Sequence, residues 1–253
     1  MAFQKKRAEA EMSFFEHLDE LRKRLMAIAV VIVAAAGICF TFVSQILDFL
    51  TAHADGLELI YTTPAEALMS QIRLAFIAGA IITLPFTLYQ ILAFIMPALR
   101  ATEKKSVVFL LISMIFLFFL GISFGYFVAF PYALTFFLGF AREGLDPLFT
   151  ISHYISFVTS FLVAFGIVFQ VPLIFWFLGH MSLISSGFLR ANRKYAVLII
   201  AIIAAVITPP DVFSQILMII PLMVLYEVGL LLVRLTERKR AKVQEVTSQE
   251  VTS

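Results

Sequence analysis

Charged residues are scarce in this chain of 253 residues: Asp, Glu, Lys and Arg together make up 14% of it, where an average soluble protein has about 25%. Cys39 is the single cysteine, so no disulfide can form within the chain, and we interpret it as a packing residue. The sequence contains no glycine-rich nucleotide-binding loop, which predicts that any work is driven by a source other than nucleotide hydrolysis.

Apolar residues dominate the chain instead. They make up 61% of it and include 28 phenylalanines, a composition typical of integral membrane proteins. We therefore predict an all-α integral membrane protein. A cleaved signal peptide is not expected, because five acids lie within the first 20 residues and the apolar run from Met26 to Val43 is long enough to span a bilayer.

The basic residues are distributed unevenly. Seventeen of the 19 fall in four segments: the N-terminal end, two internal loops and the stretch after the last apolar run. Lys and Arg concentrate in the cytoplasmic loops of membrane proteins. This alternation predicts that both termini are cytoplasmic and that the number of spans is even, and six transmembrane helices fit the apolar runs.

A charged helix is predicted over residues 13–25, directly before the first apolar run. Ser13 is expected to cap its first turn, and the side chain of Glu16, three residues later, is expected to bind the backbone of Ser13. Apolar residues recur at helical spacing and predict an interfacial helix with one face against lipid or neighbouring helices: Phe14, Leu18, Leu21 and Leu25.

Two acid–base pairs in this segment have the spacing of one helical turn. Asp19 lies four residues before Lys23, and Glu20 lies four residues before Arg24, so both pairs can form on a helix. One interpretation is a solvated face that neutralises itself. The other is that one of the acids binds a cationic partner.

The start of a second helix is indicated by Thr63 as its cap, Pro64 at its first position and Glu66 at its third. We expect this helix to end before Pro97 and to be kinked by Pro85, because proline lacks the N–H that a helix interior needs.

Glu103 lies at the start of the third span. The dipole of that helix favours a carboxylate there, which is a purely structural interpretation. The functional interpretation is that Glu20 and Glu103 are two carboxylates on the same face of the membrane, at the ends of adjacent spans.

The third apolar run, residues 107–140, is too long for one span and too short for two. We expect Pro131 to divide it, so that residues 107–130 span and residues 132–140 return as a short segment on the outer side. The stretch from Gly121 through Ser123 to Gly125 matches the pattern of a hydrolase nucleophile elbow, which requires a strand-to-helix turn and a base. Inside a spanning helix, these glycines predict close helix packing instead.

The fourth span is expected over residues 154–178, with Gln170 in its apolar middle, followed by Pro172. An amide at that depth needs a hydrogen-bond partner. Residues 195–208 supply about 21 Å of helix against a hydrocarbon core of about 30 Å. We therefore predict two short C-terminal spans and local thinning of the bilayer.

The sixth span is expected from about Val212, after a turn that holds Asp211, and it carries Gln215 and Glu227. Glu227 lies deep in an apolar helix, where a carboxyl group needs a cationic partner or the uncharged form. Pairing with another helix is the structural interpretation. Asp211 and Gln215 predict a polar edge at the outer turn.

The chain is thus predicted to divide into a cytoplasmic segment (1–25), a six-helix membrane domain (26–234) and a tail (235–253). The tail is basic at first and ends in a tandem Gln-Glu-Val-Thr-Ser repeat. Such a composition offers little to bury, so we expect disorder at its end.

Several strings occur in a fixed order along residues 13–234. They are His17-Leu18-Asp19-Glu20-Leu21-Arg22-Lys23-Arg24-Leu25, Leu84-Pro85-Phe86-Thr87-Leu88-Tyr89-Gln90, Phe94-Ile95-Met96-Pro97-Ala98-Leu99, Gly125-Tyr126-Phe127 and Thr208-Pro209-Pro210-Asp211-Val212-Phe213-Ser214-Gln215. The set closely resembles TatC, the core subunit of the twin-arginine translocase.

The resemblance implies a concave six-helix receptor for signal peptides that bear paired arginines. It implies TatA-like and TatB-like single-span partner proteins, contact with membrane lipids, a homo-oligomer within the complex and use of the protonmotive force. The implied location is the bacterial cytoplasmic (inner) membrane. No enzyme activity, catalytic residue, cofactor, metal or nucleic acid is implied.

Five residues are expected at the signal-peptide site. Glu20 and Glu103 would each hold one guanidinium group, because Arg can form two parallel hydrogen bonds with a carboxylate where Lys offers a point charge. Phe94 and Leu99 are expected as an apolar floor, and Arg22 as a residue that orients Glu20 or the peptide backbone.

Other residues are expected to contact partner subunits or to pair inside the membrane: Tyr126, Gln170, Asp211, Gln215 and Glu227. Three prolines are expected to shape the helices: Pro85, Pro97 and Pro172. Many TatC proteins carry a glutamate where this chain has Gln170. We expect this amide to bind either a partner subunit or the chain's own helices.

A small-solute secondary transporter is the alternative function. Such a protein concentrates ionisable groups or interrupted helices near the membrane midplane. The carboxylates singled out here, Glu20 and Glu103, are instead predicted at the cytoplasmic surface, which favours the receptor.

Overall fold

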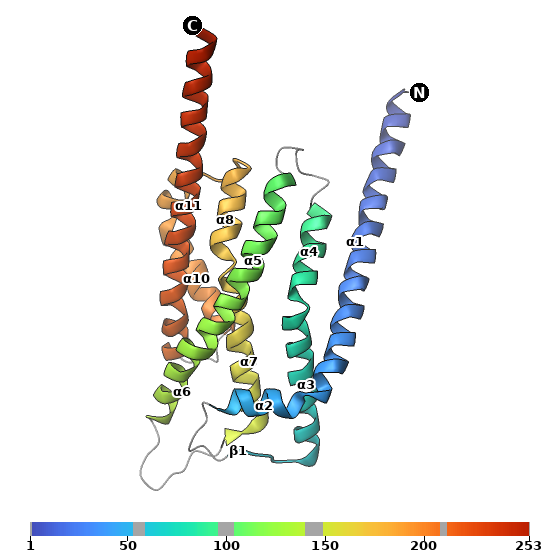
Figure 1. Ribbon diagram of the computed structural model, residues 1–253, viewed down its shortest axis with the longest axis vertical. Helices are drawn as coiled ribbons and strands as arrows, with labels where there is room; N and C mark the ends of the chain where they lie inside the picture. Colours follow the sequence, from blue (N-terminus) through green and yellow to red (C-terminus); the bar gives the residue numbers. More distant parts are fainter. Residues whose placement is uncertain (1, 53–58, 96–103, 140–148, 208–211, 253) are drawn as a thin grey trace. The chain divides into compact units, whose positions relative to one another are not determined.

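The computed structural model describes residues 2–52, 59–95, 104–139, 149–207 and 212–252, which are almost entirely helical (Figure 1). The chain forms two compact units, residues 1–52 with 62–115 and residues 53–61 with 116–253. Among the described residues, five helices are long and apolar enough to cross a membrane: Phe15–Thr41, Pro64–Ile82, Val107–Leu138, Ile151–His180 and Gln215–Ala241.

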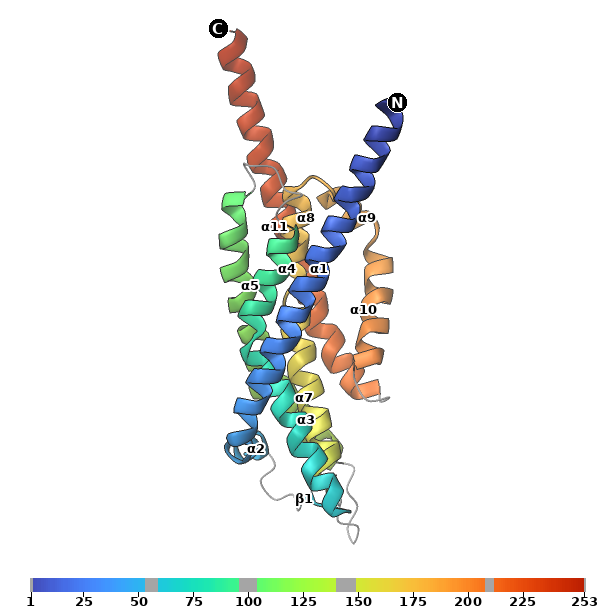
Figure 2. The ribbon, with the colours of Figure 1, turned by 90° about the vertical axis from the view of Figure 1, so that its right-hand side faces the viewer.

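The first unit begins with α1 (Ala2–Thr41), which Figure 2 shows as one unbroken helix. The prediction that Ser13 caps a helix is therefore wrong, and the charged segment is continuous with the apolar run. The physical reason lies in the sequence, since no glycine or proline interrupts it before Gly37. The short helix α2 (Val43–Thr51) follows.

The start of α3 (Pro64–Ile82) agrees with the prediction from the sequence. The Thr63 side chain accepts a hydrogen bond from the backbone N–H of Glu66, and Pro64 occupies the first position. Glu66 Oε2 in turn accepts from the backbone N–H of Thr62 at 2.9 Å. Two backbone donors at the helix start are thereby satisfied.

Two helices occupy the segment where one kinked helix was expected. α3 ends at Ile82, and α4 (Leu84–Ile95) begins after Thr83. Pro85 cannot donate to the carbonyl four residues before it, so the helix is interrupted there. The Thr83 hydroxyl donates to the carbonyl of Gly79 at 2.8 Å within this break.

α1 and α3 pack side by side at a glycine. A Cβ atom added at Gly79 would lie 2.6 Å from the backbone nitrogen of Ala36 and 2.9 Å from its Cα. Only glycine allows the two backbones to approach so closely. Cys39 of α1 is also buried, as expected of a packing residue.

In the third apolar run, α5 (Lys104–Phe124) continues through a π-helical turn, η2 (Gly125–Ala129), into α6 (Phe130–Leu138). The prediction that Pro131 divides this run and that the chain then returns is wrong. Phe130 N–H donates to the carbonyl of Gly125, five residues back. This shift in register accommodates a proline, which has no N–H of its own.

The two glycines of the elbow-like pattern lie against α7 (Ile151–Val168), which confirms the predicted close packing. A Cβ atom at Gly121 would lie 2.5 Å from the carbonyl oxygen of Phe165, and one at Gly125 would lie 3.3 Å from the Phe165 Cβ.

The rest of the second unit consists of α8 (Val171–His180), α9 (Ser186–Ala191), α10 (Arg193–Ile207) and α11 (Val212–Thr252). α10 has 15 residues, which confirms a short fifth helix. α11 has 41 residues and continues past Pro221, so the prediction of a short sixth helix is wrong. The same helix includes most of the tail, where disorder was expected; no glycine or proline follows Gly229 to end it.

Two short strands, which were not predicted, pair in parallel in this unit. β1 (Leu59–Ile60) lies beside β2 (Phe149–Thr150), with Leu59 opposite Phe149.

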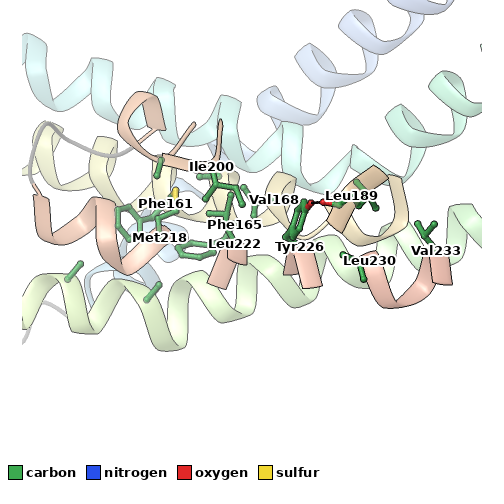
Figure 3. Packing of buried hydrophobic residues seen from close by; sticks show 14 residues of the cluster. Phe161, Phe165, Val168, Leu189, Ile200, Met218, Leu222, Tyr226, Leu230 and Val233 are labelled. Atoms are coloured by element: carbon green, nitrogen blue, oxygen red, sulfur yellow. Dashed lines mark hydrogen bonds between the residues drawn. The ribbon is translucent and has the colours of Figure 1, made fainter. Parts of the chain in front are cut away.

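The core of the second unit forms where α7, α10 and α11 meet (Figure 3). Phe161 and Phe165 of α7 are fully buried, and Met218 of α11 is buried with them. Tyr226 of α11 donates its hydroxyl hydrogen to the carbonyl of Leu189 in α9 at 2.7 Å. This bond anchors the short helix α9 to the core.

Candidate functional site

Glu20 and Arg24 form an ion pair on α1, as the spacing predicts. Arg24 donates from Nη2 at 2.6 Å and from Nε at 3.0 Å, and both bonds end on the same oxygen, Glu20 Oε1. The second predicted pair also forms, with Lys23 Nζ 2.7 Å from Asp19 Oδ2.

Arg24 also connects α1 to α4. Its third nitrogen, Nη1, donates to Gln90 Oε1 at 2.9 Å. The guanidinium group thus contacts two acceptors, one on each helix. The side chains stay partly accessible, with 24% of Arg24 and 35% of Glu20 exposed.

The second oxygen of Glu20 faces an aromatic pair. Glu20 Oε2 lies 3.8 Å from His17 Nδ1. The His17 ring stacks on Phe94 of α4, with ring centroids 4.2 Å apart and planes inclined by 12°. α1 and α4 therefore bring together the Glu20 carboxylate, the Arg24 guanidinium group and the stacked rings of His17 and Phe94.

The hydrogen bond from Arg24 lowers the pKa of Glu20 below its ordinary value of 4.5. Glu20 precedes the apolar run that begins at Met26, so it lies outside the part of α1 expected to span. Its carboxyl group is therefore ionised at neutral pH.

Arg24, and not Arg22, contacts the Glu20 carboxylate, so of the two roles predicted for Arg22 the one toward the peptide backbone stays a prediction. The Arg22 side chain is exposed. Its charge acts on Asp19, whose pKa is lowered mainly by the hydrogen bond from Lys23 and to a smaller extent by Arg22. Positions four residues apart share a face of a helix, whereas those two apart do not.

Phe94 lies in the cluster, stacked on His17, and its role as an apolar floor for a peptide stays a prediction. Other predicted residues fall outside the described part of the chain: Pro97, Leu99, Glu103 and Asp211. Gln90 was not singled out from the sequence. Its only signal was the string around Pro85, since its bond to Arg24 joins residues 66 positions apart.

The polar residues predicted for the last helices make contacts within the chain. Glu227 Oε2 of α11 accepts a bond from Arg193 Nη2 of α10 at 2.7 Å, which confirms pairing with another helix. Gln215 donates from Nε2 to the carbonyl of Ala201 in α10 at 3.1 Å. Both bonds connect the same two helices.

Gln170 lies between α7 and α8, next to Pro172, with 7% of its surface exposed. Its side-chain nitrogen donates to the carbonyl of Gly166 at 3.3 Å. Its backbone N–H donates to the carbonyl of Ile167, three residues back, at 3.0 Å. In a regular helix this N–H would bind the Gly166 carbonyl, four residues back, and here the side-chain amide binds that carbonyl instead. Tyr126 is also buried, within the π-helical turn.

Apolar helices of membrane length, with a charged cluster at the start of the first, define a multi-pass helical membrane protein. The model of one family, described as Sec-independent protein translocase protein (TatC), matches residues 16–221. The chain belongs to the TatC family and is a subunit of the Sec-independent protein translocase.

Relatives and a solved structure agree with this family. The chain is 38% identical to the TatC protein of Desulforapulum autotrophicum over 248 residues, covering 96% of this chain and 92% of the relative. It is also 38% identical to the TatC protein of Aquifex aeolicus, and this match covers 92% of this chain and 100% of the relative. A crystal structure of the twin-arginine translocase receptor TatC matches with a TM-score of 0.79 and 38% identity, covering 87% of this chain and 99% of that one. These findings support the translocase function and not that of a small-solute transporter.

Proposed function

We propose that the cluster formed by α1 and α4 is a receptor site for twin-arginine signal peptides of folded proteins. The observation that carries this proposal is the ionised and partly exposed Glu20 carboxylate beside the stacked rings of His17 and Phe94. A carboxylate binds a guanidinium group through charge-assisted hydrogen bonds. The aromatic stack offers a surface to the apolar part of an arginine side chain.

Glu103 is proposed as the second acid, so that each peptide arginine has one carboxylate. Leu99 is proposed to contribute apolar surface. Both proposals rest on the sequence pattern, in which residues 96–103 follow α4 directly.

The proposed orientation places both termini and the Glu20 cluster in the cytoplasm, with six spans and a concave bundle in the bacterial inner membrane. The support is the distribution of Lys and Arg along the sequence. Transport is proposed to use the protonmotive force, which supplies about 2.3 kcal/mol per elementary charge for each 100 mV.

The edge formed by α10 is proposed to bind a single-span partner subunit of the TatA or TatB type. α10 is short, and apolar side chains along it are exposed, among them Leu198, Ile199 and Ile202. Single cysteines along α10 should therefore form crosslinks with such a partner. Uniform labelling of the same positions by a water-soluble thiol reagent would instead indicate a water-filled pore.

Peptide binding by the purified full-length protein in detergent tests the receptor function. A labelled twin-arginine peptide is expected to bind more tightly than its twin-lysine version, and Glu20→Gln and Glu103→Gln should each weaken binding. Glu16→Gln is the matched control, because it removes the same charge from the same helix. If Glu20→Gln binds the twin-arginine peptide as well as Glu16→Gln does, the proposed site is wrong.

A further inference from the structure

The Glu20 carboxylate is already bound by a guanidinium group of the protein itself. Arg24 places two nitrogens on Oε1, and Oε2 has His17 Nδ1 at 3.8 Å. An arginine that binds a carboxylate side-on uses both oxygens at once. That arrangement cannot form on Glu20 while Arg24 remains in place.

We propose that Arg24 is an internal competitor that a peptide arginine must displace from Glu20. This inference rests on the proposed peptide-binding function. Opening the pair costs the same free energy for every ligand of Glu20. The pair therefore lowers the affinity of the site for each ligand by the same factor.

The structure provides a position for the displaced side chain. Arg24 Nη1 already donates to Gln90 Oε1 at 2.9 Å, so the guanidinium group can leave Glu20 and stay attached to α4. The pair is also partly exposed to solvent. Exposed ion pairs contribute little net stability, so exchange of one guanidinium for another is permitted.

Lysine binds the opened carboxylate more weakly than arginine for a physical reason. Its ammonium group is a compact, strongly hydrated point charge without the planar fork of arginine. It cannot reproduce the paired N–H bonds that Arg24 makes to Glu20. The preference for arginine therefore comes from the bonds made to Glu20, whereas Arg24 sets how tightly either ligand binds.

The test measures the affinities of labelled twin-arginine and twin-lysine peptides for full-length protein carrying Arg24→Gln. We expect both peptides to bind about threefold more tightly than to the unmodified protein, because a weak, partly exposed pair no longer has to be opened. The selectivity between the two peptides should not change. Arg24→Lys, which keeps the charge but loses the fork, should give an intermediate gain in affinity.

Lys23→Gln is the matched control, because Lys23 carries the same charge one residue away and pairs with Asp19. It should raise both affinities by less than Arg24→Gln does, because it removes a positive charge without opening Glu20. The proposal is overturned if Arg24→Gln changes the affinities as Lys23→Gln does. It is also overturned if Arg24→Gln weakens the binding of both peptides, because Arg24 would then hold Glu20 in position for the peptide. Glu20→Gln, with Arg24 unchanged, tests the receptor function separately. If this variant still binds the twin-arginine peptide, the proposed site itself is wrong.

Discussion

Arg193 Nη2 lies 2.7 Å from Glu227 Oε2, and this contact connects the first residue of α10 to the middle of α11. The two side chains are about half exposed within the chain, at 51% and 45%. The Gln215 amide joins the same helices at Ala201. Two polar contacts therefore join α10 to α11, at two different positions along these helices.

Arg193→Gln is expected to lower the free energy of unfolding in detergent by about 1–3 kcal/mol, because it leaves the Glu227 carboxyl group without its cation in a helix of membrane length. The charge swap, Arg193→Glu with Glu227→Arg, should recover most of this loss. Thermal unfolding of the single and double variants measures the effect. A double variant that is no more stable than the singles would show that the pair itself contributes nothing.

Gly79→Ala is expected to destabilise the first unit by about 1–3 kcal/mol, the usual cost of overpacking. The added Cβ would lie 2.6 Å from the backbone of Ala36, and a backbone atom cannot rotate away. Gly37→Ala is the matched control on α1, because nothing lies within 4 Å of a Cβ there. Equal thermal stability of the two variants would contradict this account of the helix crossing.

Tyr226→Phe is expected to lower the free energy of unfolding by about 1–2 kcal/mol, because the buried Leu189 carbonyl loses its donor. Limited proteolysis near α9 should become faster, since this bond anchors the helix (Figure 3). Tyr132→Phe removes the same hydroxyl at an exposed position and should change neither measurement. Unchanged proteolysis in Tyr226→Phe would show that packing alone holds α9.

Local patterns in the sequence predicted local contacts. The spacing of Glu20 and Arg24 predicted their ion pair, and Thr63 with Glu66 predicted the start of α3. Both depend on residues within one helical turn. Gln90 could not be assigned to the cluster, because its bond to Arg24 depends on how α4 packs against α1.

The errors all concern where helices begin and end, which single residues in a sequence indicate poorly. Ser13 has the sequence of a cap, yet α1 begins before it. Pro131 was expected to end a span, yet a π-helical turn at residues 125–129 absorbs the missing donor. The last helix was expected to be short, yet α11 continues to Thr252, since no glycine or proline after Gly229 ends it.

Gln170 provides the last prediction, which concerns the break between α7 and α8. Its side-chain amide donates to the Gly166 carbonyl inside a buried turn. Gln170→Leu removes this donor and should lower the free energy of unfolding by about 1 kcal/mol. Gln170→Glu should retain export, since an uncharged carboxyl group offers the same donor and acceptor.

Peptide binding should be unchanged in Gln170→Leu, because Gln170 belongs to the second unit and the Glu20 cluster belongs to the first. Crosslinking to a single-span partner then separates the two interpretations of this residue. Lower crosslinking at unchanged thermal stability would indicate that the amide binds a partner span. Lower stability with full crosslinking would show that Gln170 acts within its own helices, which is the outcome that the bond to Gly166 favours.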